Sequence, residues 1–146
     1  MSKQLKKLIS LPLLICIVTV SLSSAKVYGS EVMPRYNNVY SANMSTIVND
    51  NGTLTIKYNY TGNSSITNKA VITTYIEKQF LFICWTRVDI GTTNNEWTQT
   101  VNNYRYTGTR TFNLPSSGTY RTTVIYEVYG TGGSADTITC QDEITY

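Results

Sequence analysis

The feature that most constrains this chain is a two-residue alternation of apolar and polar side chains, repeated in short runs rich in Thr, Tyr, Val and Ile. Side chains of a β-strand point alternately to opposite faces of the sheet, so each run would have one buried face and one wet face. No window carries the sustained apolar stripe of a helix, and an all-β fold is therefore predicted. The clearest run lies between Gly52 and Gly62, where one face would hold Leu54, Ile56, Tyr58 and Tyr60.

Gly, Asn, Asp and Ser close these runs and predict how the strands connect. The Asn-Asp-Asn-Gly signal at residues 49–52 indicates a tight turn, so strands 39–48 and 53–60 should form a hairpin. A second hairpin is expected after the run 70–78, with its turn near residues 79–83. About seven strands at this spacing predict an antiparallel β-sandwich. The later strands are expected at 97–106 and 109–114, as one broken strand or two short ones, and at 119–129 and 135–146.

The first 25 residues have the pattern of a secretory signal peptide. Three lysines precede an uncharged run, residues 8–22, that ends in small residues up to Ala25. The run is shorter than the roughly 20 apolar residues that a membrane span needs. Cleavage is predicted after Ala25, with Gly29 as the alternative, and the product is expected to be secreted. The chain then divides into a signal peptide (1–25), an extended entry segment (26–38) and a β-sandwich domain (39–146).

Charge and composition exclude several classes of function. The chain has 146 residues and a formal charge of +3, but cleavage after Ala25 removes three lysines and leaves nine basic against nine acidic residues. A neutral chain without a basic cluster lacks the electrostatic footprint of nucleic-acid binding. The absence of histidine excludes Ser-His-Asp hydrolysis and zinc sites that use histidine. We therefore expect no enzyme activity, no cofactor and no metal site.

Two cysteines remain after cleavage, Cys84 and Cys140. In an oxidising exterior such a pair can form a disulfide, which would stabilise the fold by about 3 to 5 kcal/mol in the chain-entropy model. Both residues could equally be small buried hydrophobes. The sequence leaves both interpretations open.

A local motif precedes the expected strand 119–129. Residues 114–120, Leu-Pro-Ser-Ser-Gly-Thr-Tyr, are expected to form a turn that ends in Tyr120 at the start of this strand. The motif resembles the tyrosine corner of immunoglobulin-like (Ig-like) sandwiches, in which the phenol hydrogen-bonds to backbone a few residues upstream. The resemblance implies an Ig-like antiparallel β-sandwich of about seven strands. Thr122 stands where an Ig domain would have a cysteine, so the Ig disulfide between the sheets is absent.

A second set of motifs is spread over residues 34–146. These motifs are Pro34-Arg35-Tyr36, Tyr75-Ile76-Glu77-Lys78, Trp85 with Val88, Ser117-Gly118-Thr119-Tyr120-Arg121 and Val128-Tyr129-Gly130. In them the chain resembles small secreted proteins of Gram-positive bacteria that are catalogued as a domain of unknown function. The resemblance implies location and fold only.

Two groups of residues are candidates for a contact surface. Phe80, Leu81, Phe82 and Ile83 lie where a hairpin should turn, so an exposed tip would present apolar side chains to a membrane or to a partner. Burial of these residues on both faces of a strand, or beneath a neighbouring loop, is the alternative. The second group consists of aromatic residues that would stack on sugars or contact a protein, or would line the rim of the core. These are Trp85, Trp97, Tyr104 and Tyr106.

These observations favour a secreted, non-catalytic module that recognises a glycan, a wall polymer or a protein outside the cell or at its surface. The sandwich would hold the aromatic side chains and the apolar tip, and the tip could also contact a membrane. The alternative is a secreted membrane-active toxin or pore-forming protein, in which alternating strands such as residues 70–78 insert into bilayers. The ligand and the oligomeric state are not indicated by the sequence.

Overall fold

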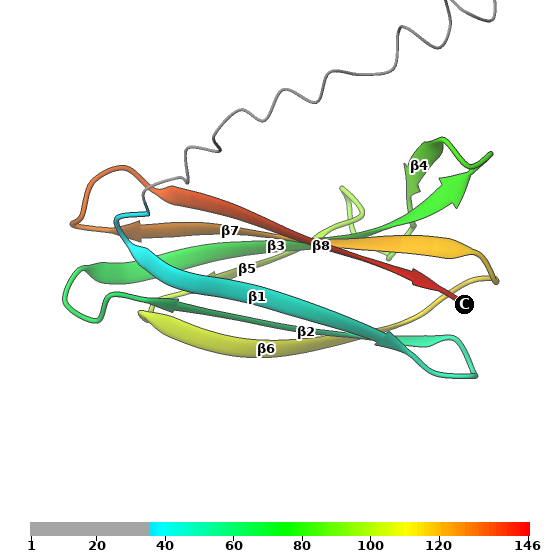
Figure 1. Ribbon diagram of the computed structural model, residues 1–146, viewed down its shortest axis with the longest axis horizontal. Helices are drawn as coiled ribbons and strands as arrows, with labels where there is room; N and C mark the ends of the chain where they lie inside the picture. The colour runs from blue at the N-terminus through cyan, green and yellow to red at the C-terminus, as the bar shows by residue number, and fades with distance from the viewer. Residues whose placement is uncertain (1–35) are drawn as a thin grey trace, which may run out of the picture. The chain divides into compact units, whose positions relative to one another are not determined.

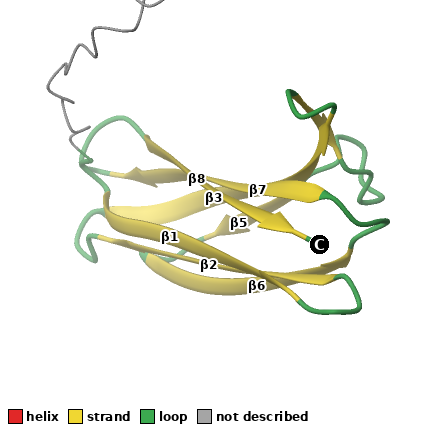
Figure 2. Cartoon of the chain, turned by 45° about the vertical axis from the view of Figure 1, so that its right-hand side comes forward, coloured by secondary structure: helices red, strands yellow, loops and turns green. Residues whose placement is uncertain are grey.

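Two antiparallel sheets face each other in the computed structural model, which describes residues 36–146 (Figure 1). The signal peptide predicted at residues 1–25, its alternative cleavage site after Gly29 and most of the entry segment 26–38 lie outside the described residues. Between residues 36 and 146 the regular structure consists of strands alone, so the all-β prediction is confirmed (Figure 2). The strands are β1 (Val39–Val48), β2 (Thr53–Gly62), β3 (Thr67–Phe80), β4 (Cys84–Arg87), β5 (Trp97–Val101), β6 (Arg105–Asn113), β7 (Thr119–Gly130) and β8 (Asp136–Thr145).

The two sheets have the orders β1-β2-β6 and β4-β3-β7-β8, and β5 also pairs with β3. Because β7 pairs with one edge of β3 over Thr67–Lys78, β4 and β5 share the other edge. The predicted strand 97–106 is broken at residues 102–104, since β5 pairs with β3 in one sheet and β6 pairs with β2 in the other. The chain therefore crosses between the layers at this point, which brings the number of strands to eight.

The core consists of the inward-facing residues of both sheets, as the alternation predicts. In β2 the exposed fractions of Leu54, Ile56, Tyr58 and Tyr60 are 0%, 0%, 2% and 1%. In β3 the inward side chains of Ile72, Thr74 and Ile76 are buried to a similar extent. The remaining fully buried large side chains come mainly from β7, namely Tyr120, Val124, Tyr126 and Val128.

Buried phenols need hydrogen-bond partners, and three of the tyrosines donate to backbone carbonyls. The Tyr60 hydroxyl donates to Asn103 at 2.6 Å, and the Tyr126 hydroxyl donates to Asn43 at 2.7 Å. The Tyr120 hydroxyl donates to the Ser116 carbonyl at 2.6 Å, four residues upstream, which is the contact expected of a tyrosine corner. These bonds connect the core to β1 and to two of the loops.

The first predicted hairpin is confirmed by the pairing of β1 with β2 from Ile47 and Thr55 through Ala42 and Tyr60. Its turn is closed by a hydrogen bond from the Gly52 amide to the Asn49 carbonyl at 2.9 Å. Gly52 has a φ of 78°, a left-handed conformation that glycine adopts without steric cost.

Asp136 holds the start of β1 against the start of β8. Its carboxylate accepts hydrogen bonds from three consecutive backbone amides, those of Asn37 at 3.2 Å, Asn38 at 2.6 Å and Val39 at 3.1 Å. The carboxylate is buried, and hydrogen bonds to a charged acceptor are stronger than those between neutral groups. Asp136 thereby fixes the point at which the described chain enters the sandwich.

The disulfide considered for Cys84 and Cys140 is not formed, and both residues are free thiols. Cys84 lies in β4 and Cys140 in β8, at opposite edges of a sheet in which β3 and β7 lie between them. Three strand spacings separate the two backbones by roughly 14 Å, whereas a disulfide needs Cα atoms within about 7 Å. Cys140 is half-buried, and burial raises the pKa of its thiol.

We predict that Asp136→Asn lowers the free energy of unfolding by about 2 to 3 kcal/mol, because an amide offers one oxygen where two now accept three N–H groups. Urea unfolding at pH 7 measures this change. Asp142→Asn is the matched control, since Asp142 accepts a single backbone amide, that of Thr46 at 3.0 Å, and should cost less. An equal loss in both variants would contradict the role given to Asp136.

Alkaline pH should destabilise the fold through its buried tyrosines. Burial raises the pKa of Tyr60 from 10.0 to about 12, and it also raises the pKa of Tyr126. The unfolded chain therefore loses these protons first, and stability falls as the pH rises from about 10 to about 12, by up to about 1.4 kcal/mol per pH unit for each tyrosine. Below pH 10 the full contribution of both residues is present.

The measurement compares urea midpoints at pH 8 and pH 11. Tyr60→Phe should reduce the difference between the two midpoints, although it lowers stability at both. Tyr40→Phe is the control, because Tyr40 is 71% exposed, and it should leave the difference unchanged. A pH dependence that Tyr60→Phe and Tyr126→Phe both leave intact would show that other groups cause it.

Candidate functional site

The β3–β4 hairpin projects beyond the sandwich. β3 has 14 residues, and its pairing with β7 ends at Lys78, so the last residues of β3 pair only with β4. Figures 1 and 2 show these two strands bending away from the sheet at one end of the molecule. The predicted turn near residues 79–83 is confirmed, because Phe80 pairs with Cys84.

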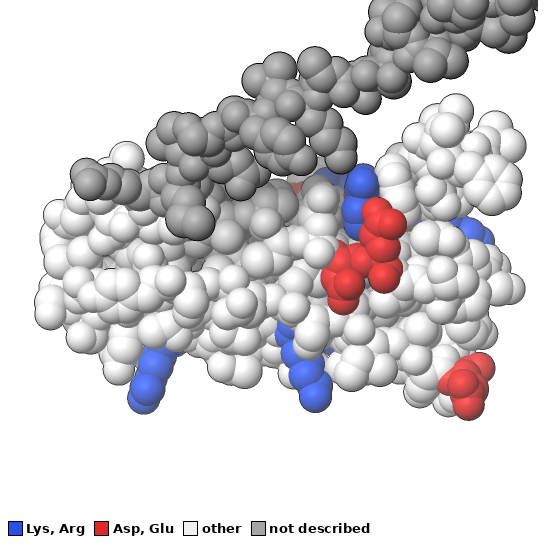
Figure 3. Space-filling view, in the orientation of Figure 1, with Lys and Arg blue, Asp and Glu red and all other residues white. Residues whose placement is uncertain are grey.

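The tip of this hairpin is apolar and exposed. The exposed fractions are 62% for Phe80, 67% for Leu81, 91% for Phe82 and 81% for Ile83. The alternative in which these residues are buried on both faces, or lie beneath a neighbouring loop, is therefore wrong. In Figure 3 the lobe at the upper right, where Figure 1 places β4, shows no charged atoms at its outer end. We call Phe80, Leu81, Phe82 and Ile83 the hairpin tip.

The turn within the hairpin tip is strained. Leu81 and Phe82 have φ values of 51° and 63°, and the Ile83 amide donates to the Phe80 carbonyl at 3.4 Å. Two central residues with positive φ define a type I′ turn, which usually carries Asn-Gly. A left-handed conformation costs of order 1 to 3 kcal/mol for a residue that is not glycine. Two large apolar side chains are thus exposed to solvent at positions whose backbone conformation is unfavourable.

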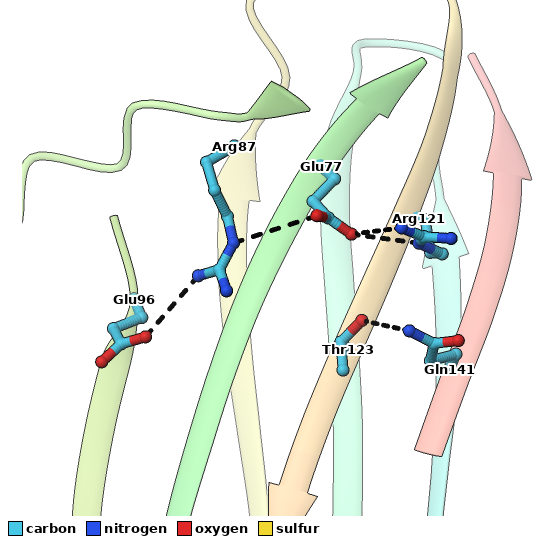
Figure 4. Close-up of polar contacts among 6 residues, drawn as sticks. All are labelled: Glu77, Arg87, Glu96, Arg121, Thr123 and Gln141. Carbon is cyan, nitrogen blue, oxygen red and sulfur yellow. Dashed lines mark hydrogen bonds and ion pairs between the residues drawn. The ribbon is translucent and has the colours of Figure 1, made fainter. Parts of the chain in front are cut away.

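An ion-pair network lies at the base of the hairpin, on the outer face of the sheet (Figure 4). Both Nε and Nη2 of Arg121 donate to Oε2 of Glu77, at 3.0 and 2.8 Å. Arg87 lies 4.0 Å from the other carboxylate oxygen of Glu77 and 3.6 Å from Glu96. Glu77 therefore joins β3 to β4 on one edge and to β7 on the other.

Two aromatic rings are stacked on this network. The Arg87 guanidinium lies 3.2 Å from the centre of the Tyr75 ring, and the Arg121 guanidinium lies 4.3 Å from the centre of the Trp85 ring. Trp85 is the residue opposite Gln79 in the hairpin, one pair below the tip. These cation–π contacts fix the direction in which the hairpin leaves the sheet.

The other aromatic candidates lie elsewhere. Trp97 packs edge-on against Phe112 with ring centres 6.0 Å apart, and Tyr106 packs against Tyr58 at 6.2 Å. Trp97 and Tyr106 are both partly buried against the core, which agrees with the alternative prediction that these aromatic residues line its rim. Tyr104 lies in the crossing between β5 and β6, with Arg105 5.4 Å from its ring centre. The structure thus brings Trp85 and the hairpin tip together and separates the other three aromatics from them.

A hollow of about 380 Å³ lies on the inner side of the hairpin. Lys78, Phe80, Thr86, Val88 and Pro115 contribute to its lining, so the apolar tip continues into a concave surface toward the loop before β7. Lys78 closes one side, because its ammonium donates to the Ser116 hydroxyl at 2.6 Å and to the Ser117 carbonyl at 2.9 Å.

The carboxylates at the base of the hairpin are partners of arginines. No group of three or more His, Cys, Asp or Glu side chains gathers within residues 36–146. Both oxygens of Glu77 face arginines, so this carboxylate is an ion-pair partner within the sheet. No described helix is long and apolar enough to cross a membrane.

Comparison with known proteins gives no family for this chain, since no protein-family model and no curated protein matches it.

The residues at the base of the hairpin could not be identified from sequence alone. Glu77 and Arg121 are 44 positions apart and meet only because β3 and β7 are paired in this register. The positive φ angles of Leu81 and Phe82 have no sequence signal either, because neither residue type favours that conformation. Only their apolar character in a turn indicated something unusual.

The strain at the tip gives a testable prediction. Replacing Leu81 and Phe82 together by Asn and Gly, the residues preferred in a type I′ turn, should raise the free energy of unfolding by about 1 to 3 kcal/mol. Urea unfolding measures the change. Leu81→Ala with Phe82→Ala is the control, since alanine removes the same apolar surface but keeps the steric cost of positive φ. Equal stability of the two double variants would show that the turn is not strained.

Proposed function

We propose that this protein is a secreted, non-catalytic recognition module with an Ig-like sandwich, and that the β3–β4 hairpin is its contact element. The observation that carries the proposal is the hairpin tip, which holds four adjacent apolar side chains in water at 62% exposure or more. Apolar residues gathered at a projecting point typically mark an interaction site. The strained turn adds support, since strain of this kind clusters at functional sites.

The Ig-like assignment is supported by strand order and by one hydrogen bond. If β1, β2 and β6 correspond to strands A, B and E, then β3, β7 and β8 correspond to C, F and G in the facing sheet. On this correspondence Tyr120 lies at the start of strand F, where its hydroxyl contacts Ser116 as a tyrosine corner does. We also propose that the chain is related to the small secreted proteins of Gram-positive bacteria that its sequence motifs resemble.

Export is proposed from the leader, whose basic and apolar parts match a signal peptide. A protein that works outside the cell meets surfaces, polymers and other proteins. Among these, sugar stacking is the less supported target, because Trp97 and Tyr106 pack against the core rather than forming an open aromatic strip. The hairpin tip favours a target with an apolar surface.

A membrane-active toxin is the second candidate, and the exposed tip is the observation in its favour. Pore formation by the alternating strand 70–78 is harder to reconcile with the fold. Ile72, Thr74 and Ile76 lie in the core, and β3 pairs with β7 along one edge and with β4 and β5 along the other. Insertion of this strand would require the sandwich to open, whereas recognition through the tip requires no rearrangement.

The proposal predicts that binding to target surfaces depends on the hairpin tip. Protein purified from culture medium would be incubated with whole cells, isolated cell wall and soluble glycans. Phe82→Ser should weaken its binding about tenfold or more, because full burial of such a side chain contributes about 1.5 to 3 kcal/mol. Ile47→Ser, at a residue that is 60% exposed in β1, is the control and should bind as the parent does.

Circular dichroism and urea unfolding would confirm that both variants fold. If the parent binds and folded Phe82→Ser binds equally well, the hairpin tip is not the contact element. If the parent binds none of the surfaces, the proposed recognition function itself is wrong.

A further inference from the structure

Polarity changes in an ordered way along the β3–β4 hairpin. Leu81 and Phe82 form the end of the turn, Ile83 follows them, and Phe80 pairs with Cys84 at the first cross-strand level. Below the tip, the register gives three successive cross-strand levels, from the tip toward the sheet. These levels are Gln79 with Trp85, Lys78 with Thr86, and Glu77 with Arg87.

This order matches the interface of a lipid bilayer. The hydrocarbon accepts apolar side chains, Trp is enriched at the level of the headgroups, and charged groups remain in the hydrated zone. Trp85 is two residue positions from Ile83, a rise of about 7 Å along a strand. Interfacial segments embed their apolar parts to a depth of about 5 to 10 Å. The length of the apolar part thus fits one interface and not a whole bilayer.

We propose that the partner of this hairpin is the surface of a lipid bilayer, into whose outer leaflet Phe80, Leu81, Phe82 and Ile83 insert while Trp85 lies among the headgroups. This inference rests on the proposed function, because it names the partner of the same contact element. A bilayer needs no complementary shape, so it can receive the four exposed side chains of the hairpin tip.

A protein partner is less favoured by size. A stable protein–protein interface takes about 800 Å² from each side, which is more than four side chains at the end of one hairpin present. On the outer face the apolar area ends at Glu77, Arg87 and Arg121, and on the inner side it continues into the hollow that Phe80, Val88 and Pro115 help to line. A lipid bilayer, which can take up the hairpin tip alone, fits this small apolar area better.

The charges near the tip indicate which lipids are needed. Arg87 and Arg121 are both paired with Glu77, and Arg87 is also paired with Glu96. Lys78 lies two residues before Phe80, and Asp89 lies with it around the inner hollow. Cationic and anionic side chains thus balance around the hairpin. Binding should therefore depend little on anionic lipid and on salt, unlike binding by a basic patch.

The experiment uses secreted protein and phosphatidylcholine vesicles, with and without anionic lipid. Trp97→Phe leaves Trp85 as the single tryptophan of the mature chain, so its emission reports on this residue. We expect the protein to float with both kinds of vesicle, Trp85 emission to shift to shorter wavelength, and entrapped dye to stay inside. Phe82→Ser should lower the vesicle-bound fraction about tenfold, and Ile47→Ser should not.

The double replacement of Leu81 by Asn and Phe82 by Gly provides a second loss-of-apolar variant whose turn is relaxed, so loss of binding cannot be attributed to poor folding. Three outcomes would overturn the inference. They are parent protein that does not float with vesicles, floating that folded tip variants retain, and floating accompanied by dye release, which would instead favour the toxin.

The test separates the inference from the proposed function. If whole cells still bind the protein through Phe82 but vesicles do not, the hairpin recognises something other than lipid and the recognition function stands. If neither cells nor vesicles bind, both proposals fail.

Discussion

The pairing of β3 with β7 over Thr67–Lys78 is the interaction on which the rest of the structure depends. It places the inward side chains of two central strands opposite the facing sheet and leaves one edge of β3 free for β5 and β4. Because β3 is 14 residues long, its last residues extend past Lys78 without β7. The projection of the hairpin is therefore a consequence of strand length, and Glu77 secures it where the three strands still lie together.

Three buried phenols and one buried carboxylate form hydrogen bonds with backbone groups, and these bonds tie loops and strand ends to the core. Tyr60, Tyr120 and Tyr126 each donate a hydrogen bond to a backbone carbonyl outside their own strand. The Asp136 carboxylate accepts hydrogen bonds from three consecutive backbone amides at the start of β1. Each bond removes the cost of burying an unpaired polar atom. These hydrogen bonds join the start of β1, the crossing at residues 102–104 and the loop before β7 to the core, while Cys84 and Cys140 are not bridged.

Local patterns in the sequence predicted the features that depend on local spacing. The burial of Leu54 and Tyr60, the turn at Gly52 and the contact of Tyr120 all follow from residues within a few positions of one another. Features that depend on pairing between distant strands could not be predicted in this way. The crossing at residues 102–104 and the Glu77–Arg121 ion pair need the sheet order, which alternation does not specify. The sequence left a disulfide between Cys84 and Cys140 open for the same reason, since the strand order decides that the two cysteines lie apart.

The hairpin tip shows how the two kinds of information combine. Its sequence conflicts with its conformation, since Leu81 and Phe82 adopt positive φ and expose apolar surface at the same time. A chain under selection for stability alone would favour Asn-Gly at these positions. The sandwich can tolerate the conflict because β3 and β4 are anchored below the tip by the stacked Arg87 and Arg121. A strained turn on well-anchored strands is expected where the turn serves binding rather than folding stability. The hairpin tip has these properties.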